Sequence, residues 1–162
     1  MIVVSNTTPL IGLAVVGQFD LLAHLFGSIT IPTAVYDEAV LFGREQGGAK
    51  QEVADAHWIE VIPVQDQLAV EVLLDELDRG EAETIVLARE LNAAWVLMDE
   101  KKGRRKLTEM GIPKVGTVGL LLKGKQIGYL DHLEPCLEQL RREGFSLSQT
   151  VIADALRQAG EN

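Results

Sequence analysis

The sequence predicts an α/β fold in which helices cover both faces of a parallel β-sheet. The first observation is the β-branched run at residues 2–4, which has no polar alternation and is therefore typical of a strand buried on both sides. A second apolar run of this kind, at residues 95–98, comes late in the chain. Segments with helical patterns alternate with such strands, and this alternation indicates a parallel sheet.

Composition limits the classes of protein to which the chain can belong. With 162 residues, 47% of them hydrophobic, we expect one compact domain over residues 1–162. Cys136 is the single cysteine, which excludes an internal disulfide and agrees with a reducing cytosol. No apolar run approaches the roughly 18 residues of a membrane span, and Met1 leads directly into a strand, so a soluble cytoplasmic protein is expected. The formal net charge of −9 argues against wide, nonspecific coating of nucleic acid, although a local basic patch can still serve a small site.

The first strand ends on the short polar side chains of Asn6, Thr7 and Thr8. Pro9 suits the first turn of a helix that Thr8 caps. In open α/β sheets, ligands bind at the carboxyl ends of the strands, so these residues mark a candidate site. The alternative is that they only cap the helix.

Turn and capping signals place the remaining elements in order. Gly17 and Gly27 close two short helices, and Pro32 opens a longer one. The helices from about residue 130 onward are amphipathic, and they pack either on this domain or on a partner. The strands expected after the first are at residues 28–31, 58–63, 95–98 and 114–117. The expected helices are at residues 10–16, 19–26, 32–42, 49–56, 67–77, 81–92, 117–122, 131–142 and 149–158.

Glu38 is a candidate site residue in the helix that Pro32 opens. On a helical wheel it lies between Ala34 and Phe42, on an apolar side where a carboxylate is normally avoided, whereas Asp37 falls on a different face. We therefore expect Glu38 to point inward. The alternative is a solvated position at the rim.

Glu81 is a second candidate. At about 100° per residue it falls near the middle of an apolar arc of its helix, whereas Glu83 and Glu90 fall on the polar side. Arg89 also falls within this arc, which the wheel does not explain. The arc consists of Ala82, Ile85, Ala88 and Leu91. The alternative role for Glu81 is structural, because Asp78 lies three residues before it, at the spacing of a capping box.

Asp99 and Glu100 follow the strand at residues 95–98, just as Asn6 follows the first strand. Asp99 could simply cap a following helix, but a strand end beside a basic run favours a site. That run holds five of the fifteen Lys and Arg residues, and they are Lys101, Lys102, Arg104, Arg105 and Lys106. Such a run either is a solvated helix face or contacts phosphate.

These side chains together predict a site for a hard cation. The proposed ligands are Asn6, Glu38, Glu81 and Asp99, with Glu100 in reserve. Mg²⁺ and Mn²⁺ prefer oxygen ligands of this kind, and they can activate water for in-line displacement on a phosphodiester. The chain lacks a P-loop, GxGxxG, HExxH and GxSxG, which removes the usual rival sites.

At these residues the chain resembles the PIN-domain nucleases, and it is most similar to the compact branch of VapC-type toxins of toxin–antitoxin pairs. The resemblance implies a three-layer α/β/α sandwich with a central parallel sheet of order 3-2-1-4-5. It also implies acidic residues that bind Mg²⁺ or Mn²⁺, endoribonuclease activity on single-stranded RNA, homodimers, and a small antitoxin protein that blocks the site. The resembling segments are residues 3–11, 31–38, 80–83, 97–100, 103–104 and 116–119.

One residue departs from the family pattern. The first strand normally ends on Asp, and here that position is Asn6, which keeps an oxygen ligand but lacks the negative charge that would attract a cation and polarise its water.

The leading hypothesis is a metal-dependent endoribonuclease in which Glu38, Glu81 and Asp99 hold the ion, Asn6 assists and Thr7 orients a ligand or water. In this hypothesis the phosphate backbone is steered by Lys101, Lys102, Arg104 and Arg105.

Two alternatives remain. The first is a PIN-like module with impaired catalysis that binds RNA or a partner protein. The second is a flavodoxin- or receiver-like domain. Against the second, Ser5 and Asn6 do not supply the acidic pair of a receiver, and aromatic residues, 5% of the chain, are absent from the first loop.

Overall fold

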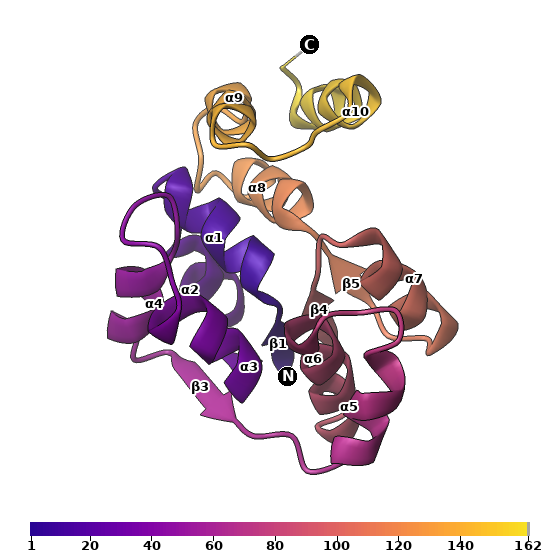
Figure 1. Ribbon diagram of the computed structural model, residues 1–162. Coiled ribbons are helices and arrows are strands. Elements are labelled where there is room, and N and C mark those ends of the chain that lie inside the picture. Colours follow the sequence, from indigo (N-terminus) through magenta and orange to yellow (C-terminus); the bar gives the residue numbers. More distant parts are fainter. Residues whose placement is uncertain (162) are drawn as a thin grey trace.

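The computed structural model describes residues 1–161, and five parallel strands form a sheet at its centre (Figure 1). The strand order is β3-β2-β1-β4-β5. The strands are β1 (Val3–Ser5), β2 (Ile29–Pro32), β3 (Ile59–Ile62), β4 (Trp95–Leu97) and β5 (Lys114–Val115). The predicted fold class and the sheet order implied by the resemblance are both confirmed.

Alternation along the strands divides the core between the two faces of the sheet. Val3 and Leu97 belong to one hydrophobic cluster, whereas Val4 and Val96, which are partners in the sheet, belong to another. Successive strand residues point to opposite faces, so a strand that is apolar at every position needs helices on both sides. This explains why the run at the start of the chain has no polar alternation.

Helices cover each face. The face that bears Val4 and Val96 is covered by α5 (Gln67–Leu73), α6 (Arg79–Glu90) and α7 (Lys101–Glu109). The other face is covered by α1 (Thr7–Val15), α2 (Leu21–Phe26), α3 (Thr33–Tyr36), the π-helical turn η1 (Asp37–Leu41) and α4 (Lys50–Asp55), with α8 (Thr117–Gln126), α9 (Glu134–Arg142) and α10 (Gln149–Ala159) beyond them.

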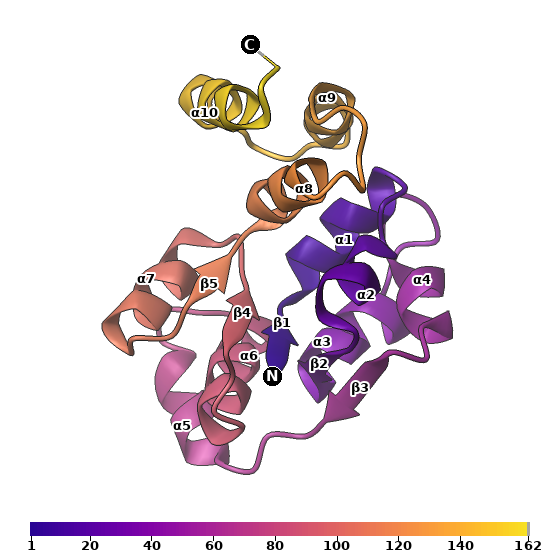
Figure 2. The same ribbon diagram turned by 180° about the vertical axis from the view of Figure 1, so that it is seen from behind.

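The last two helices lie beyond α8, at the end of the molecule farthest from β3 (Figures 1 and 2). Leu137 and Leu140 of α9 and Ala155 of α10 are buried in the same cluster as Leu10 of α1. The amphipathic C-terminal helices therefore pack on helices of this chain.

The helix expected over residues 32–42 differs from the prediction. Pro32 ends β2, α3 is one turn long, and the backbone N–H of Phe42 then donates to the carbonyl of Asp37 at 2.8 Å, which is a π-type bond. A π-helical turn advances by a different angle per residue from an α-helix. The wheel that grouped Phe42 with Ala34 was therefore wrong, because Phe42 is 81% exposed and Ala34 is buried.

Other expected boundaries shift by a few residues. The first helix begins at Thr7, so the helix N-cap is Asn6 and the expectation that Thr8 is the cap was wrong. The helix expected to end at residue 77 ends at Leu73. Within residues 1–161, none of the helices combines the length and the apolar character that crossing a membrane requires.

Candidate active site at the carboxyl edge of the sheet

The ends of β1 and β4 lie side by side. Ser5 pairs with Leu97, and the backbone N–H of Asn6 donates to the carbonyl of Leu97 at 3.0 Å. The Asn6 side chain is buried, and its Nδ2 lies 3.5 Å from Sδ of Met98. Residues that follow the two strands therefore meet at one edge of the sheet, as the sequence predicted.

Thr7 connects this edge to Glu38. The buried Thr7 hydroxyl donates to Oε2 of Glu38 at 2.9 Å. Oε1 of Glu38 occupies the space that a Cβ at residue 80 would fill, so this approach to the start of α6 requires Gly80. Glu38 as a whole residue is exposed, as the rim alternative proposed, but its carboxylate reaches inward to Thr7 and α6.

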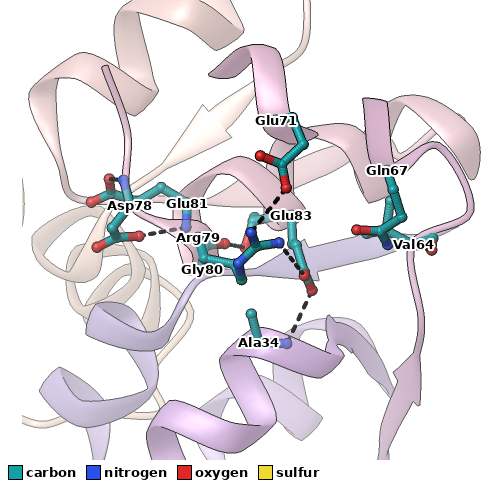
Figure 3. A network of polar contacts seen from close by, with 10 residues as sticks. Ala34, Val64, Gln67, Glu71, Asp78, Arg79, Gly80, Glu81 and Glu83 are labelled. Atoms are coloured by element: carbon teal, nitrogen blue, oxygen red, sulfur yellow. Dashed lines mark hydrogen bonds and ion pairs between the residues drawn. The ribbon is translucent and has the colours of Figure 1, made fainter. Parts of the chain in front are cut away.

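Glu81 is half-buried at the start of α6, and it takes part in a complete capping box (Figure 3). Asp78 Oδ1 accepts from the backbone N–H of Glu81 at 2.8 Å, and Glu81 Oε1 accepts from the backbone N–H of Asp78 at 3.0 Å. The structural role considered for Glu81 is therefore present. The Glu81 carboxylate also lies within electrostatic reach of Glu38, whose charge adds to the rise in the pKa of Glu81.

The helical wheel placed Glu83 on the polar side of α6, but in the structure this residue is buried. It is 7% exposed, and its Oε1 accepts from the backbone N–H of Ala34 at 3.0 Å (Figure 3). Its Oε2 lies 3.7 Å from Nη1 of Arg79, which also contacts Glu71. The wheel was wrong because α6 is buried on more than one side, and the unbroken small and apolar run after Glu83 is the signal that could have indicated this.

Arg89, which the wheel placed in the apolar arc, is exposed and pairs with Asp66 at 3.2 Å. Its long side chain carries the charge out to solvent from a helix whose preceding residues are buried.

Asp99 is held by the start of α8. Its Oδ1 accepts from the backbone N–H of Thr117 at 2.8 Å, and its Oδ2 accepts from the Thr117 hydroxyl at 2.6 Å. A Cβ at residue 116 would lie 2.6 Å from Oδ1, so Gly116 permits this contact. Asp99 thus caps a helix, but that helix is α8 and not the one that follows it directly. Sequence reasoning did not assign this role to Thr117.

Glu100 and one residue of the basic run make structural contacts, whereas other residues of the run are exposed. Glu100 Oε2 accepts from the backbone N–H of Gly103 at 2.8 Å and so caps α7. Arg104 reaches the strand end, where Nη1 donates to the carbonyl of Met98 at 2.8 Å. The exposed members of the run are Lys101, Lys102 and Arg105.

The carboxylates at this edge affect one another's protonation. Partial burial raises the pKa of Glu38; the Thr7 hydrogen bond acts against this rise, and the charges of Asp78 and Glu83 add to it. For Glu81, partial burial likewise raises the pKa, with opposition from the Asp78 backbone hydrogen bond and support from the nearby charges of Asp78, Glu100 and Glu38. A bound cation would relieve this repulsion between carboxylates.

The donor types fit a hard divalent cation, since they are carboxylates and one amide. Each oxygen of Asp99 accepts one hydrogen bond, which leaves about two of the roughly four lone-pair sites of a carboxylate. Within residues 1–161, no group of three or more His, Cys, Asp and Glu side chains is arranged to hold a metal ion. The fit to a cation therefore lies in charge and donor chemistry.

A family model for the PIN domain matches residues 2–161 of the chain. No curated protein matches the chain. The matched residues include every described helix and strand, from β1 to α10. The chain therefore belongs to the PIN-domain family, whose members are generally nucleases that act on nucleic acids with divalent metal ions.

Proposed function

We propose that this chain is a metal-dependent endoribonuclease of the VapC-like toxin type, which hydrolyses phosphodiester bonds of single-stranded RNA. The observation that supports the proposal is that Glu81 and Asp99 line one cavity at the carboxyl edge of the sheet of a PIN-domain protein, while the charge of Glu38 acts on Glu81. Charge repulsion among carboxylates at this edge supports a site built to attract a cation.

In this proposal the chain's own residues bind the metal ion and orient its ligands. Glu38, Glu81 and Asp99, with Glu100 in reserve, would hold Mg²⁺ or Mn²⁺, and Asn6 would add an amide oxygen. Thr7 keeps the Glu38 carboxylate turned inward through its hydrogen bond. When bound, the ion would activate water and stabilise the attacking and leaving oxygens of the phosphodiester.

Basic side chains would bind the substrate backbone. Arg104 is the residue of the basic run that reaches the strand end. Exposed Lys101, Lys102 and Arg105 on α7 would attract phosphate from solvent, an interaction that weakens as salt rises.

The proposal also covers the assembly in which the site works. We propose that residues 1–162 act as one domain, that the protein forms a homodimer, and that a small antitoxin protein blocks the site. A cytoplasmic location is part of this proposal, and the single cysteine, Cys136, supports it.

Cleavage of a mixed-sequence single-stranded RNA tests this function. We expect cleavage by purified protein with Mn²⁺ or Mg²⁺, and loss of cleavage with EDTA or in Glu81→Gln. Glu138→Gln is the matched control, because Glu138 is exposed on α9, away from the acidic edge. Equal loss in both variants, or cleavage that survives EDTA, would contradict the proposal.

A second candidate function is an impaired module that binds RNA or a partner protein without efficient cleavage. The observation that favours it is Asn6, whose neutral amide is directed at Met98 Sδ where an acidic ligand is normal for the family. Asn6→Asp separates the two functions. If the Asn6 protein is inactive while Asn6→Asp cleaves, the natural sequence is a binding module.

A further inference from the structure

A cavity of about 520 Å³ opens directly beside the acidic residues. Its wall includes Glu81 and Asp99, together with Thr8 of α1 and the connection between α9 and α10 at residues 143–147. The volume lies within the roughly 300–1,000 Å³ of pockets that bind small ligands. The cavity and the candidate active site therefore share three carboxylates, those of Glu81, Asp99 and Glu100.

Another part of the cavity wall is apolar. Phe145 is the one aromatic residue in the lining that the structure describes, and it also packs against the main core. The other apolar side chains of the wall are Ile11, Val118 and Leu147. The cavity thus combines an apolar, partly aromatic surface with a charged one.

The end of α9 fixes the position of Phe145. Gly144 adopts a φ of +95°, and its N–H donates to the carbonyl of Arg141 at 3.1 Å. The N–H of Phe145 donates to the carbonyl of Leu140 at 3.0 Å, which completes a Schellman motif. Cε2 of the ring lies 3.3 Å from the position that a Cβ at Gly12 would take. The ring is therefore anchored against α1 and presents a fixed surface to the cavity.

Arg44 adds a positive charge to the same cavity. Its guanidinium folds over Gly47, where φ is +76° and a Cβ would lie 3.7 Å from Cζ. Within residues 1–161, no acidic side chain lies within ion-pair distance of Arg44. Its charge is therefore available to a phosphate group.

We propose that this cavity is a nucleobase subsite, in which the base of a nucleotide next to the scissile phosphate stacks on Phe145 while Arg44 contacts the RNA backbone. The inference rests on the proposed function and deepens it by locating one base of the substrate. A base has an apolar face that stacks on aromatic rings and a polar edge for the charged wall. Only an unpaired base can enter, because paired bases stay stacked within a duplex, so the subsite selects single strands.

Binding of labelled RNA tests the subsite separately from cleavage. Fluorescence anisotropy would compare a short single-stranded RNA with an abasic ribose-phosphate chain of the same length, with the integrity of each checked on a gel. The variants are Phe145→Leu, which keeps an apolar side chain, and Phe145→Trp, which keeps an aromatic one. Phe42→Leu is the control, because Phe42 is an exposed aromatic residue outside the cavity.

We expect Phe145→Leu to weaken binding of the RNA about tenfold and to leave binding of the abasic chain unchanged. Phe145→Trp and Phe42→Leu should bind the RNA as the parent protein does. Equal loss for both chains, unchanged binding in Phe145→Leu, or no binding of RNA by the parent would overturn the subsite.

The outcomes also separate the subsite from the nuclease activity. Cleavage by the parent with unchanged RNA affinity in Phe145→Leu would remove the subsite and leave the nuclease. Base-dependent binding that is lost in Phe145→Leu, without any cleavage by the parent, would support the subsite and remove the nuclease.

Discussion

Glu38 and Glu161 are carboxylates whose surroundings shift their pKa values in opposite directions. Burial and neighbouring acids raise the pKa of Glu38 above 4.5, despite its hydrogen bond from Thr7. Burial alone would also raise the pKa of Glu161, but hydrogen bonds from the backbone N–H groups of Leu133 and Glu134 and the ion pair with Lys125 lower it. The two residues therefore contribute to stability with opposite dependence on pH.

The sign of each contribution follows from proton binding. Between the ordinary and the raised pKa of Glu38, the folded protein holds a proton that the unfolded chain releases, so stability falls as pH rises through this interval. At Glu161 the folded protein stays ionised to lower pH, so its contribution is present above the ordinary pKa and is lost on acidification through the lowered one.

We predict that Glu38→Gln and Glu161→Gln change the free energy of unfolding in opposite directions in metal-free buffer. Relative to the parent, Glu38→Gln should gain stability as pH rises from about 4 to about 8, because Gln still accepts from Thr7 but carries no charge. Glu161→Gln should lose stability relative to the parent as pH rises from the lowered to the ordinary pKa of Glu161, and the difference should stay constant at higher pH. Urea unfolding at several pH values measures both differences, and the same slope in both variants would contradict the prediction.

At the scale of elements, Glu83 joins α6 to the start of α3. Its carboxylate accepts from the backbone N–H of Ala34, so a residue on α6 holds the segment that leads into η1 and Glu38. We propose Glu83 as a positioning residue for Glu38.

Substitution of Glu83 tests this link. Glu83→Ala leaves the N–H of Ala34 without a partner and should cost about 1–3 kcal/mol of stability, whereas Glu83→Gln keeps an acceptor and should cost less. Urea unfolding measures the stability, and the RNA cleavage rate reports whether Glu38 has moved. If Glu83→Gln loses as much stability and activity as Glu83→Ala, the acceptor role is wrong.

Local signals in the sequence were sufficient to predict some elements and insufficient for others. The strand at residues 95–98 was predicted to within a residue, because a short apolar run that ends at Asp99 and Glu100 is typical of a buried strand. Glu83 was misplaced because a wheel assumes one buried face, and α6 is covered on several sides. The π-turn at η1 was missed because its extra residue has no signature in the hydrophobic pattern.

At the scale of the whole molecule, strand order brings the site together. β1 lies between β2 and β4, so residues after β1 and β4 meet at one edge. The pattern of residues 1–6 located this edge, but the order of strands came from the family resemblance. The contact between Asp99 and Thr117 and the cavity beside Phe145 depend on packing of α8 and α9, which local patterns do not specify.

The central claim is that this acidic edge binds a divalent cation, and calorimetric titration of Mn²⁺ into metal-free protein tests it most directly. We predict a saturable binding event that weakens at least about tenfold in Glu81→Gln, because that substitution removes one charged oxygen ligand. Glu138→Gln should bind as the parent does, and Asn6→Asp should bind more tightly. Absence of Mn²⁺ binding in both the parent and Asn6→Asp, or equal binding in Glu81→Gln and Glu138→Gln, would contradict the claim.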